Sequence, residues 1–162
     1  MDLMEAYRRA QDGVDAMLAA VPPEMWEAPS ACPGWTLRDV AGHIIWGQEQ
    51  MRHWATGQDY TVTAGAPGTS RPGEMASGDP LAMWRAARAD SVKTLTAEAI
   101  GRTVDIPGLG TVPLAGLITA WWNDQLIHTW DIGHGLGTEV RSRRPPSWPR
   151  RPRGSARSRG RG

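Results

Sequence analysis

The sequence predicts an all-α protein, an up-down four-helix bundle followed by a disordered C-terminal tail. Four segments carry apolar residues at helical spacing, and no segment shows convincing sheet alternation. The last residues change abruptly to Arg, Pro, Ser and Gly, a composition that cannot form an apolar core. A chain of 162 residues has room for one domain. We therefore expect one helical domain over residues 1–138 and a disordered tail over residues 139–162.

The first two predicted helices have clear ends. Residues 3–21 place apolar side chains every three or four positions, and Pro22-Pro23 ends that helix. The second helix begins at Thr36, an N-cap residue, with Asp39 three positions later where a capping carboxylate belongs. Its apolar positions continue as far as Gly57.

The third predicted helix follows a long loop. Residues 58–78 are rich in Gly, Thr, Pro and Ser, which is typical of a loop. Asp79-Pro80 then combines a cap with proline at the first helical position, so a helix should run to about Ile100.

The fourth predicted helix follows a short extended excursion over residues 103–112. It begins at Pro113 and reaches roughly residues 133–137. Four amphipathic helices of this kind favour an up-down bundle, and the long loop before the third helix leaves a crossover connection open.

Charge is distributed unevenly along the chain. Residues 141–162 contain nine arginines and no acid, whereas residues 1–140 hold the other nine basic residues and all 17 acids, a formal charge of −8. A nucleic-acid-binding domain needs a basic face to displace counterions. We therefore expect no nucleic-acid partner, apart from non-specific contact by the Arg-rich tail.

The composition also predicts a compartment. No apolar run approaches the roughly 20 residues that cross a bilayer, and the charged first 20 residues do not resemble a signal peptide. The single cysteine, Cys32, cannot form an internal disulfide and should pack as a small apolar group. We expect a cytoplasmic protein without a membrane partner, either a monomer or a homodimer.

Asp124 and His128 are the first part of a candidate metal site. They lie four residues apart and therefore share one helix face, which also carries Leu117 and Trp121 and should be buried. A buried carboxylate and a buried imidazole each need a partner, and a cation supplies one to both.

The second predicted helix offers His43 on another inward-facing stripe. Gly47, one turn later, should leave space for a ligand or ion. Two histidines and an aspartate with an open coordination position suit a catalytic Zn²⁺ site, and Ni²⁺, Mn²⁺ or Fe²⁺ are also admissible. Trp46, Trp121 and Trp122 are candidates for lining a pocket mouth.

Spacing alone leaves simpler interpretations open. An Asp/His pair at this spacing often forms only a surface hydrogen bond, and a lone histidine on an apolar face is more often a core residue than a ligand. Asp131, seven residues beyond Asp124, could orient a ligand histidine or accept a proton in catalysis. The interpretation we favour from spacing is a helix-end acid bonded to a neighbouring Trp or Arg.

Two motifs resemble a known family. Residues 32–44 read Cys-Pro-Gly-Trp-Thr-Leu-Arg-Asp-Val-Ala-Gly-His-Ile, and residues 124–132 read Asp-Gln-Leu-Ile-His-Thr-Trp-Asp-Ile, followed by Gly-Leu-Gly at 135–137. Both are similar to actinobacterial metal-binding proteins related to mycothiol-dependent maleylpyruvate isomerase, within the DinB-like four-helix-bundle superfamily. The resemblance covers residues 1 to about 138. It implies a DinB-like bundle with a metal held by His43, Asp124 and His128.

The resemblance also implies a function. In the related isomerases and thiol transferases, the metal holds a low-molecular-weight thiol as its nucleophilic thiolate. This chain would accordingly be a metal-dependent enzyme that uses a mycothiol-like thiol for isomerisation or S-transfer on a small-molecule substrate. Asp124 stands where the isomerase usually has glutamate, which separates the chain from the maleylpyruvate reaction. The alternatives are a metal-activated water in a hydrolase, a non-catalytic metal-binding or stress protein, and a truncated inactive family member.

The tail has a further interpretation. Bundles of this family normally continue with another helix after the Gly-Leu-Gly. Residues 147–151, Ser-Trp-Pro-Arg-Arg, can be written in GC-rich codons that encode Leu-Ala-Glu-Ala when read two bases later. We therefore hypothesise that residues from about 139 onward result from a frameshift. Resequencing the gene would refute this if no neighbouring frame encodes an amphipathic helix.

Overall fold

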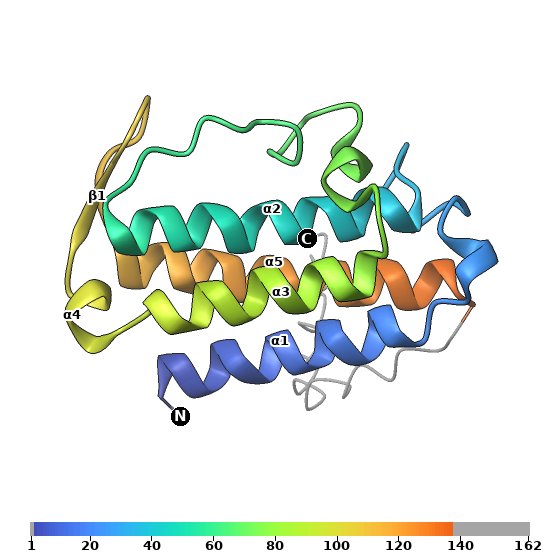
Figure 1. Ribbon diagram of the computed structural model, residues 1–162, viewed down its shortest axis with the longest axis horizontal. Coiled ribbons are helices and arrows are strands. Elements are labelled where there is room, and N and C mark those ends of the chain that lie inside the picture. The colour runs from blue at the N-terminus through green and yellow to red at the C-terminus, as the bar shows by residue number, and fades with distance from the viewer. Residues whose placement is uncertain (1, 138–162) are drawn as a thin grey trace, which may run out of the picture.

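Four long helices lie side by side in the computed structural model, which describes residues 2–137 (Figure 1). They are α1 (Leu3–Ala19), α2 (Leu37–Thr56), α3 (Pro80–Thr94) and α5 (Leu114–Gly135). Among the four long helices, α1 packs mainly against α5 and α3, and α2 packs mainly against α3 and α5. The predicted all-α fold is confirmed, whereas the predicted tail lies outside the described residues. Within the described part of the chain, no helix has the length and apolar character needed to cross a membrane.

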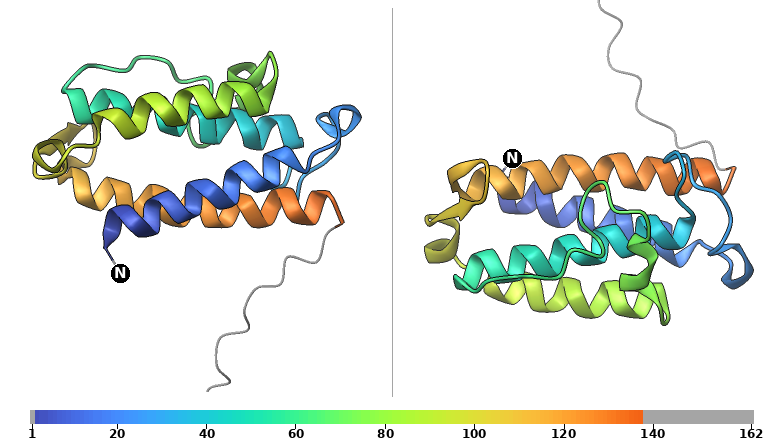
Figure 2. Two further views of the ribbon diagram at one scale, coloured as in Figure 1. Left: turned by 60° about the horizontal axis from the view of Figure 1, so that its bottom comes forward. Right: turned by 90° about the horizontal axis from the view of Figure 1, so that it is seen from above.

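A long crossover connects α2 to α3. These two helices run in the same direction, opposite to α1 and α5, so residues 57–79 return alongside α2 to its N-terminal end (Figures 1 and 2). The short 3-10 helix η2 (Pro72–Ala76) docks there, where Asp39 Oδ1 accepts a hydrogen bond from the Gly73 N–H at 2.9 Å. Gly42 permits the approach, because a Cβ at this position would overlap the Pro72 carbonyl. The sequence neither required nor excluded a long crossover connection, and the structure contains one.

The third helix is shorter than expected. The prediction of one helix from Pro80 to about Ile100 is wrong, because α3 ends at Thr94 and a separate turn, α4 (Ala97–Ile100), follows. Thr96 begins this turn as an N-cap, and its hydroxyl accepts a hydrogen bond from the Ala99 N–H at 3.2 Å. A capping hydroxyl of this kind competes with continuation of the preceding helix.

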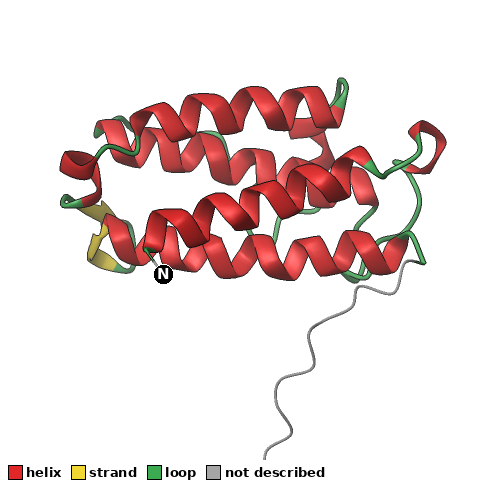
Figure 3. Cartoon of the chain, turned by 90° about the horizontal axis from the view of Figure 1, so that it is seen from below, coloured by secondary structure: helices red, strands yellow, loops and turns green. Residues whose placement is uncertain are grey.

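The predicted extended excursion is a β-hairpin. β1 (Thr103–Ile106) pairs antiparallel with β2 (Gly110–Pro113), with Thr103 opposite Pro113 and Ile106 opposite Gly110. The hairpin lies at the end of the bundle where α5 begins, and is yellow in Figure 3. Val104 and Ile106 pack against the apolar core at this end. The hairpin therefore closes one end of the bundle without forming a larger sheet.

Two apolar clusters fill the bundle, and a layer of polar side chains separates them. One cluster lies toward the start of α2 and includes Ile44 and Trp84, and the other lies toward the hairpin and includes Met51 and Ile118. Every long helix contributes to the polar layer. Its fully buried members are Tyr7, Gln11, Gln48, Ser91 and Gln125.

This polar layer is only partly hydrogen-bonded. Gln11 Nε2 donates to Gln48 Oε1 at 2.9 Å, and Gln48 Nε2 donates to the Tyr7 hydroxyl at 3.1 Å. Burial raises the pKa of Tyr7 despite these amide neighbours. The Gln125 amide lies close enough to the Tyr7 hydroxyl to oppose that rise, but it makes no hydrogen bond of good geometry among residues 2–137. An unpartnered buried amide costs about 1–3 kcal/mol, so Gln125 lowers the stability of the fold.

Candidate metal centre

The start of α2 fixes the position of His43. Thr36 and Asp39 form the predicted capping box: the Asp39 N–H donates to the Thr36 hydroxyl at 3.1 Å, and the Thr36 N–H donates to Asp39 Oδ2 at 2.9 Å. Because Asp39 also binds η2, the capped end of α2 is tied to the crossover. His43 lies one turn further along and is only 2% exposed.

The structure brings His43, Asp124 and His128 together across the seam between α2 and α5. Asp124 Oδ2 lies 3.4 Å from His43 Nε2, and Asp124 Oδ1 lies 3.5 Å from His128 Nε2. One ligand atom from each residue falls within 4.8 Å of the other two. The two imidazole rings meet edge to face, with centroids 4.9 Å apart.

Hydrogen bonds on the far side of each imidazole set its orientation. His43 Nδ1 lies 2.6 Å from the Gly65 carbonyl oxygen, and His128 Nδ1 lies 2.9 Å from Asp131 Oδ2. A carbonyl or carboxylate oxygen only accepts, so both Nδ1 atoms must carry the proton. In the neutral rings, each Nε2 therefore presents its lone pair toward Asp124.

The helix-end interpretation favoured for Asp131 is wrong. Its carboxylate is 6% exposed and binds His128 rather than a neighbouring Trp or Arg. Asp131 follows His128 by three positions, and this spacing places both side chains on one face of the helix. This contact supports the other interpretation, in which Asp131 orients a histidine of the site.

The electrostatics of the three residues are strongly coupled. Burial alone would raise the pKa of Asp124, but His128 and His43 outweigh it and lower the pKa to about 2. Burial would lower the pKa of His128, but Asp124 and Asp131 outweigh it and raise the pKa. The carboxylate is therefore ionised at neutral pH, and a proton competes for the His128 lone pair.

The chemistry of these residues fits a divalent ion. Ligand atoms bound about 2.0–2.1 Å from one tetrahedral ion lie roughly 3.4 Å apart. The 3.4 Å contact to His43 and the 3.5 Å contact to His128 involve different oxygens of Asp124, and one ligand atom from each of the three residues lies within 4.8 Å of the other two, so the three side chains would draw closer together around an ion. Asp124 Oδ2 is buried and has no hydrogen-bond partner within residues 2–137. An ion would complete the coordination of that oxygen as well as of the two imidazole lone pairs.

Tryptophan rings surround the centre. The rings of Trp35, Trp46 and Trp121 have centroids 5.3, 6.2 and 5.5 Å from that of His43. The expectation that Gly47 leaves space for a ligand is wrong, because a Cβ there would overlap the Trp121 ring. The glycine instead allows that ring to pack against α2.

The expectation for Trp122 is not met, whereas the expectation for Cys32 is. Trp122 packs with the apolar cluster near the hairpin and contributes no ring contact to His43 or His128 within the described residues. Cys32 packs against the other cluster, as predicted, and burial together with Asp131 and Asp124 raises the pKa of its thiol. A raised pKa disfavours the nucleophilic thiolate.

Two contributors were missed by sequence reasoning. Trp35 directly precedes the Thr36 cap, so its place beside His43 could have been suspected from the motif around the helix start. The Gly65 carbonyl carried no such signal, because it lies in the middle of the long crossover loop. Gly65 packs against the side of Trp46, where a Cβ would overlap the indole.

A family model described as the mycothiol maleylpyruvate isomerase N-terminal domain matches residues 7–133. The chain belongs to this family. An uncharacterised protein of Mycobacterium tuberculosis is 30% identical over 138 residues, which is 85% of this chain and 69% of the relative. A second uncharacterised protein of that species is 26% identical over 141 residues, 80% of this chain and 54% of the relative.

Solved structures show the same isomerase-like fold. A crystal structure of the mycothiol-dependent maleylpyruvate isomerase superposes with a TM-score of 0.60 at 21% identity, and a histidine-to-alanine mutant of that enzyme with 0.58 at 23%. The match covers 82% of this chain but only 61% of the isomerase. This isomerase-like domain thus spans less than two thirds of the solved enzyme.

Proposed function

We propose that this isomerase-like domain binds one divalent metal ion through His43, Asp124 and His128. The observation that carries the proposal is the convergence of two imidazole lone pairs and one ionised carboxylate, with both imidazoles fixed from behind. Zinc is the preferred ion because this donor set suits it, with nickel, manganese and iron as alternatives.

We further propose that the site serves thiol chemistry. A bound divalent ion favours the thiolate form of a coordinating thiol. The family and the solved relative, named as mycothiol-dependent, support a mycothiol-like thiol as the cosubstrate. Isomerisation of a small unsaturated molecule, or S-transfer to an electrophilic carbon, would follow from attack by such a thiolate.

The protein's own residues would prepare this reaction. Asp131 and the Gly65 carbonyl hold the two imidazoles, and the surrounding indoles reduce the access of water to the ligand atoms. The three ligands leave a fourth position for the thiol sulfur. Dependence on a reduced thiol and the single cysteine together favour a cytoplasmic location.

Metal analysis of purified protein tests the site. We expect about one zinc per chain in the wild type and almost none in His43→Ala or His128→Ala. His134→Ala is the matched control, because His134 lies exposed on the same helix and stacks on Trp130 at 4.1 Å. Stoichiometric metal in both site variants would refute the metal centre.

Activity assays test the thiol separately. The zinc-loaded protein should convert an electrophilic substrate only when mycothiol is present, releasing the thiol again in an isomerisation and consuming it in an S-transfer, and His128→Ala should do neither. Zinc binding without any thiol dependence would leave the metal centre intact but contradict the proposed chemistry.

A further inference from the structure

One part of the crossover lies against the metal centre although it belongs to no helix or strand. Residues 59–70, which we call the strap, return alongside α2 (Figure 1). The backbone–backbone hydrogen bonds of the strap all stay within it. Only two hydrogen bonds join it to other described residues, and in both of them a side chain of α2 reaches a carbonyl oxygen of the strap. The position of the strap therefore depends on these two side chains and on packing against α2.

The two side chains are those of His43 and Trp46. His43 Nδ1 lies 2.6 Å from the Gly65 carbonyl oxygen, and the Trp46 indole N–H donates to the Val62 carbonyl oxygen at 2.6 Å. Trp46 follows His43 by three positions, so both reach the strap from one face of α2, and their rings stack with centroids 6.2 Å apart. Gly65 also lies directly on the base of the Trp46 side chain, where a Cβ would overlap it. Trp46 therefore holds the strap at two points.

The strap transmits this hold because its turn is braced from within. The Thr69 hydroxyl donates to two carbonyl oxygens of the same turn, at 2.8 and 2.9 Å. The turn that carries Gly65 should therefore move as one piece. A strap released at Val62 would take the Gly65 carbonyl away from His43.

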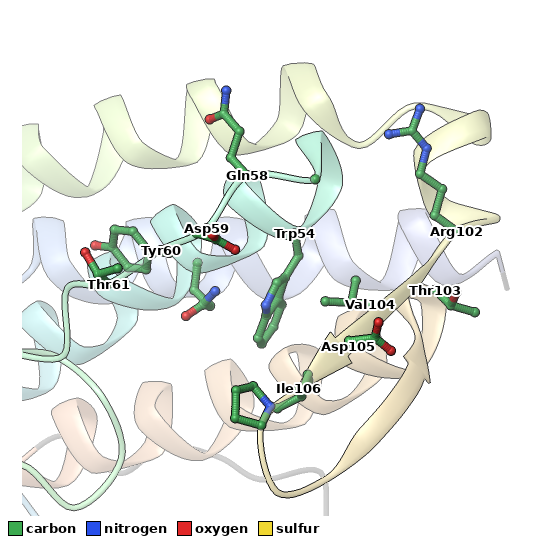
Figure 4. A pocket seen from close by; sticks show the side chains of 13 residues that line it. Trp54, Gln58, Asp59, Tyr60, Thr61, Arg102, Thr103, Val104, Asp105 and Ile106 are labelled. Atoms are coloured by element: carbon green, nitrogen blue, oxygen red, sulfur yellow. The ribbon is translucent and has the colours of Figure 1, made fainter.

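The beginning of the strap forms one wall of a pocket between the C-terminal end of α2 and the β-hairpin. This pocket has a volume of about 550 Å³, and Asp59, Tyr60 and Thr61 line it together with Trp54 and β1 (Figure 4). Tyr60 stacks on His53 of α2 with ring centroids 4.7 Å apart. The strap thus runs from the wall of this pocket to the metal centre, and the same anchors position it at both places.

We propose that Trp46 is a positioning residue of the metal centre, which holds the strap so that the Gly65 carbonyl orients His43. The proposal rests on the proposed metal binding. An acceptor behind a ligand imidazole fixes its tautomer and its orientation, and thereby strengthens the bond from the other nitrogen to the metal. Trp46 offers no ligand atom and acts through Val62 and Gly65. By linkage, a metal bound to His43 in turn stabilises the attached strap, including the wall of the pocket.

The zinc affinity of Trp46→Phe tests the proposal. Phenylalanine keeps an aromatic ring at this position but removes the indole N–H. We expect zinc binding to weaken about tenfold, at the lower end of the 10–100-fold range for partners behind a ligand. Trp130→Phe is the matched control and should bind zinc normally, because Trp130 is exposed on α5 and its indole N–H donates to no described residue.

A second variant reaches the strap from its other side. Gly65→Ala should also weaken zinc binding about tenfold, because its Cβ would lift the strap off Trp46. Both substitutions act through the same strap, so the double variant should bind zinc about as weakly as either single variant. Independent effects would instead multiply to about a hundredfold.

Exchange of the Trp46 indole N–H with solvent, followed by ¹⁵N NMR and assigned with Trp46→Phe, reports attachment of the strap directly. Trp46 is only 8% exposed and its N–H binds Val62, so exchange requires the strap to open. Zinc should slow this exchange about tenfold in the wild type, matching the loss of affinity. Gly65→Ala should accelerate it, and the exposed Trp130 indole should exchange equally fast with and without zinc.

Zinc affinity of Trp46→Phe within twofold of wild type would overturn the proposal, even if the variant melted at a lower temperature, since Trp46 would then serve packing alone. A hundredfold loss in the double variant would also overturn it, and so would exchange at Trp46 that does not respond to zinc. In each of these cases the wild type still binds zinc, so the metal centre stands. A wild type that binds no zinc would refute the proposed function and this inference together.

Discussion

Replacing Asp131 by asparagine tests how much the residue behind His128 contributes to metal binding. The carboxylate lies 2.9 Å from His128 Nδ1 and is 6% exposed, so solvent screens the interaction little. Asparagine can still accept a hydrogen bond through its amide oxygen. The substitution therefore removes the negative charge while keeping a group of the same size in place.

The expected loss follows from the loss of charge. A carboxylate behind a ligand imidazole makes Nε2 more basic, and removing such a partner typically weakens metal binding 10–100-fold, or about 1.4–2.7 kcal/mol. The loss should depend on pH. Asp131 is one of the two carboxylates that raise the pKa of His128, so the variant should have a lower His128 pKa and weaker competition from protons. The affinity deficit should therefore be larger at pH 8 than at pH 6.

Zinc affinity would be measured by competition with a chromophoric chelator across this pH range. Asp90→Asn is the matched control, because it removes the same charge from an exposed residue of α3 paired with Lys93. Affinity of Asp131→Asn within twofold of wild type at pH 8 would refute the reasoning. A deficit that grows on acidification would contradict the assigned sign of the His128 pKa shift.

Two stability predictions follow from packing. Gly47→Ala should lower the free energy of unfolding, measured in urea, by about 1–3 kcal/mol, because the added Cβ would overlap the Trp121 ring. Gly13→Ala, with nothing within 4 Å of the added Cβ, should instead stabilise α1 by about 0.5–1 kcal/mol, and equal effects at both glycines would contradict this account. In the polar layer, Tyr7→Phe should lower the free energy of unfolding by about 1–3 kcal/mol, because it removes the hydroxyl that accepts from the Gln48 amide. Gln125→Met should leave the free energy of unfolding unchanged or raise it. A large loss in Gln125→Met would show that this amide does have a partner.

Several features were accessible from the sequence because they depend on local geometry. The capping box at Thr36 and Asp39 follows from residue types three positions apart at a helix start. The shared face of Asp124 and His128 follows from the helical repeat. The same rule could have paired Asp131 with His128. The break after Thr94 was harder, because an apolar pattern continues through it and only the Thr96 cap marks the new turn.

What the sequence alone determined is thus a set of four helices, most of their ends, and the shared face of Asp124 and His128, since backbone geometry and capping fix these over a few residues. Only the tertiary structure decided that His43 meets Asp124 across two helices, that the crossover brings the Gly65 carbonyl to His43, and that Trp121 occupies the space beside Gly47. These contacts depend on how each helix is rotated about its axis and on where a long loop returns. Both are set by packing of the whole core, which the local pattern does not specify.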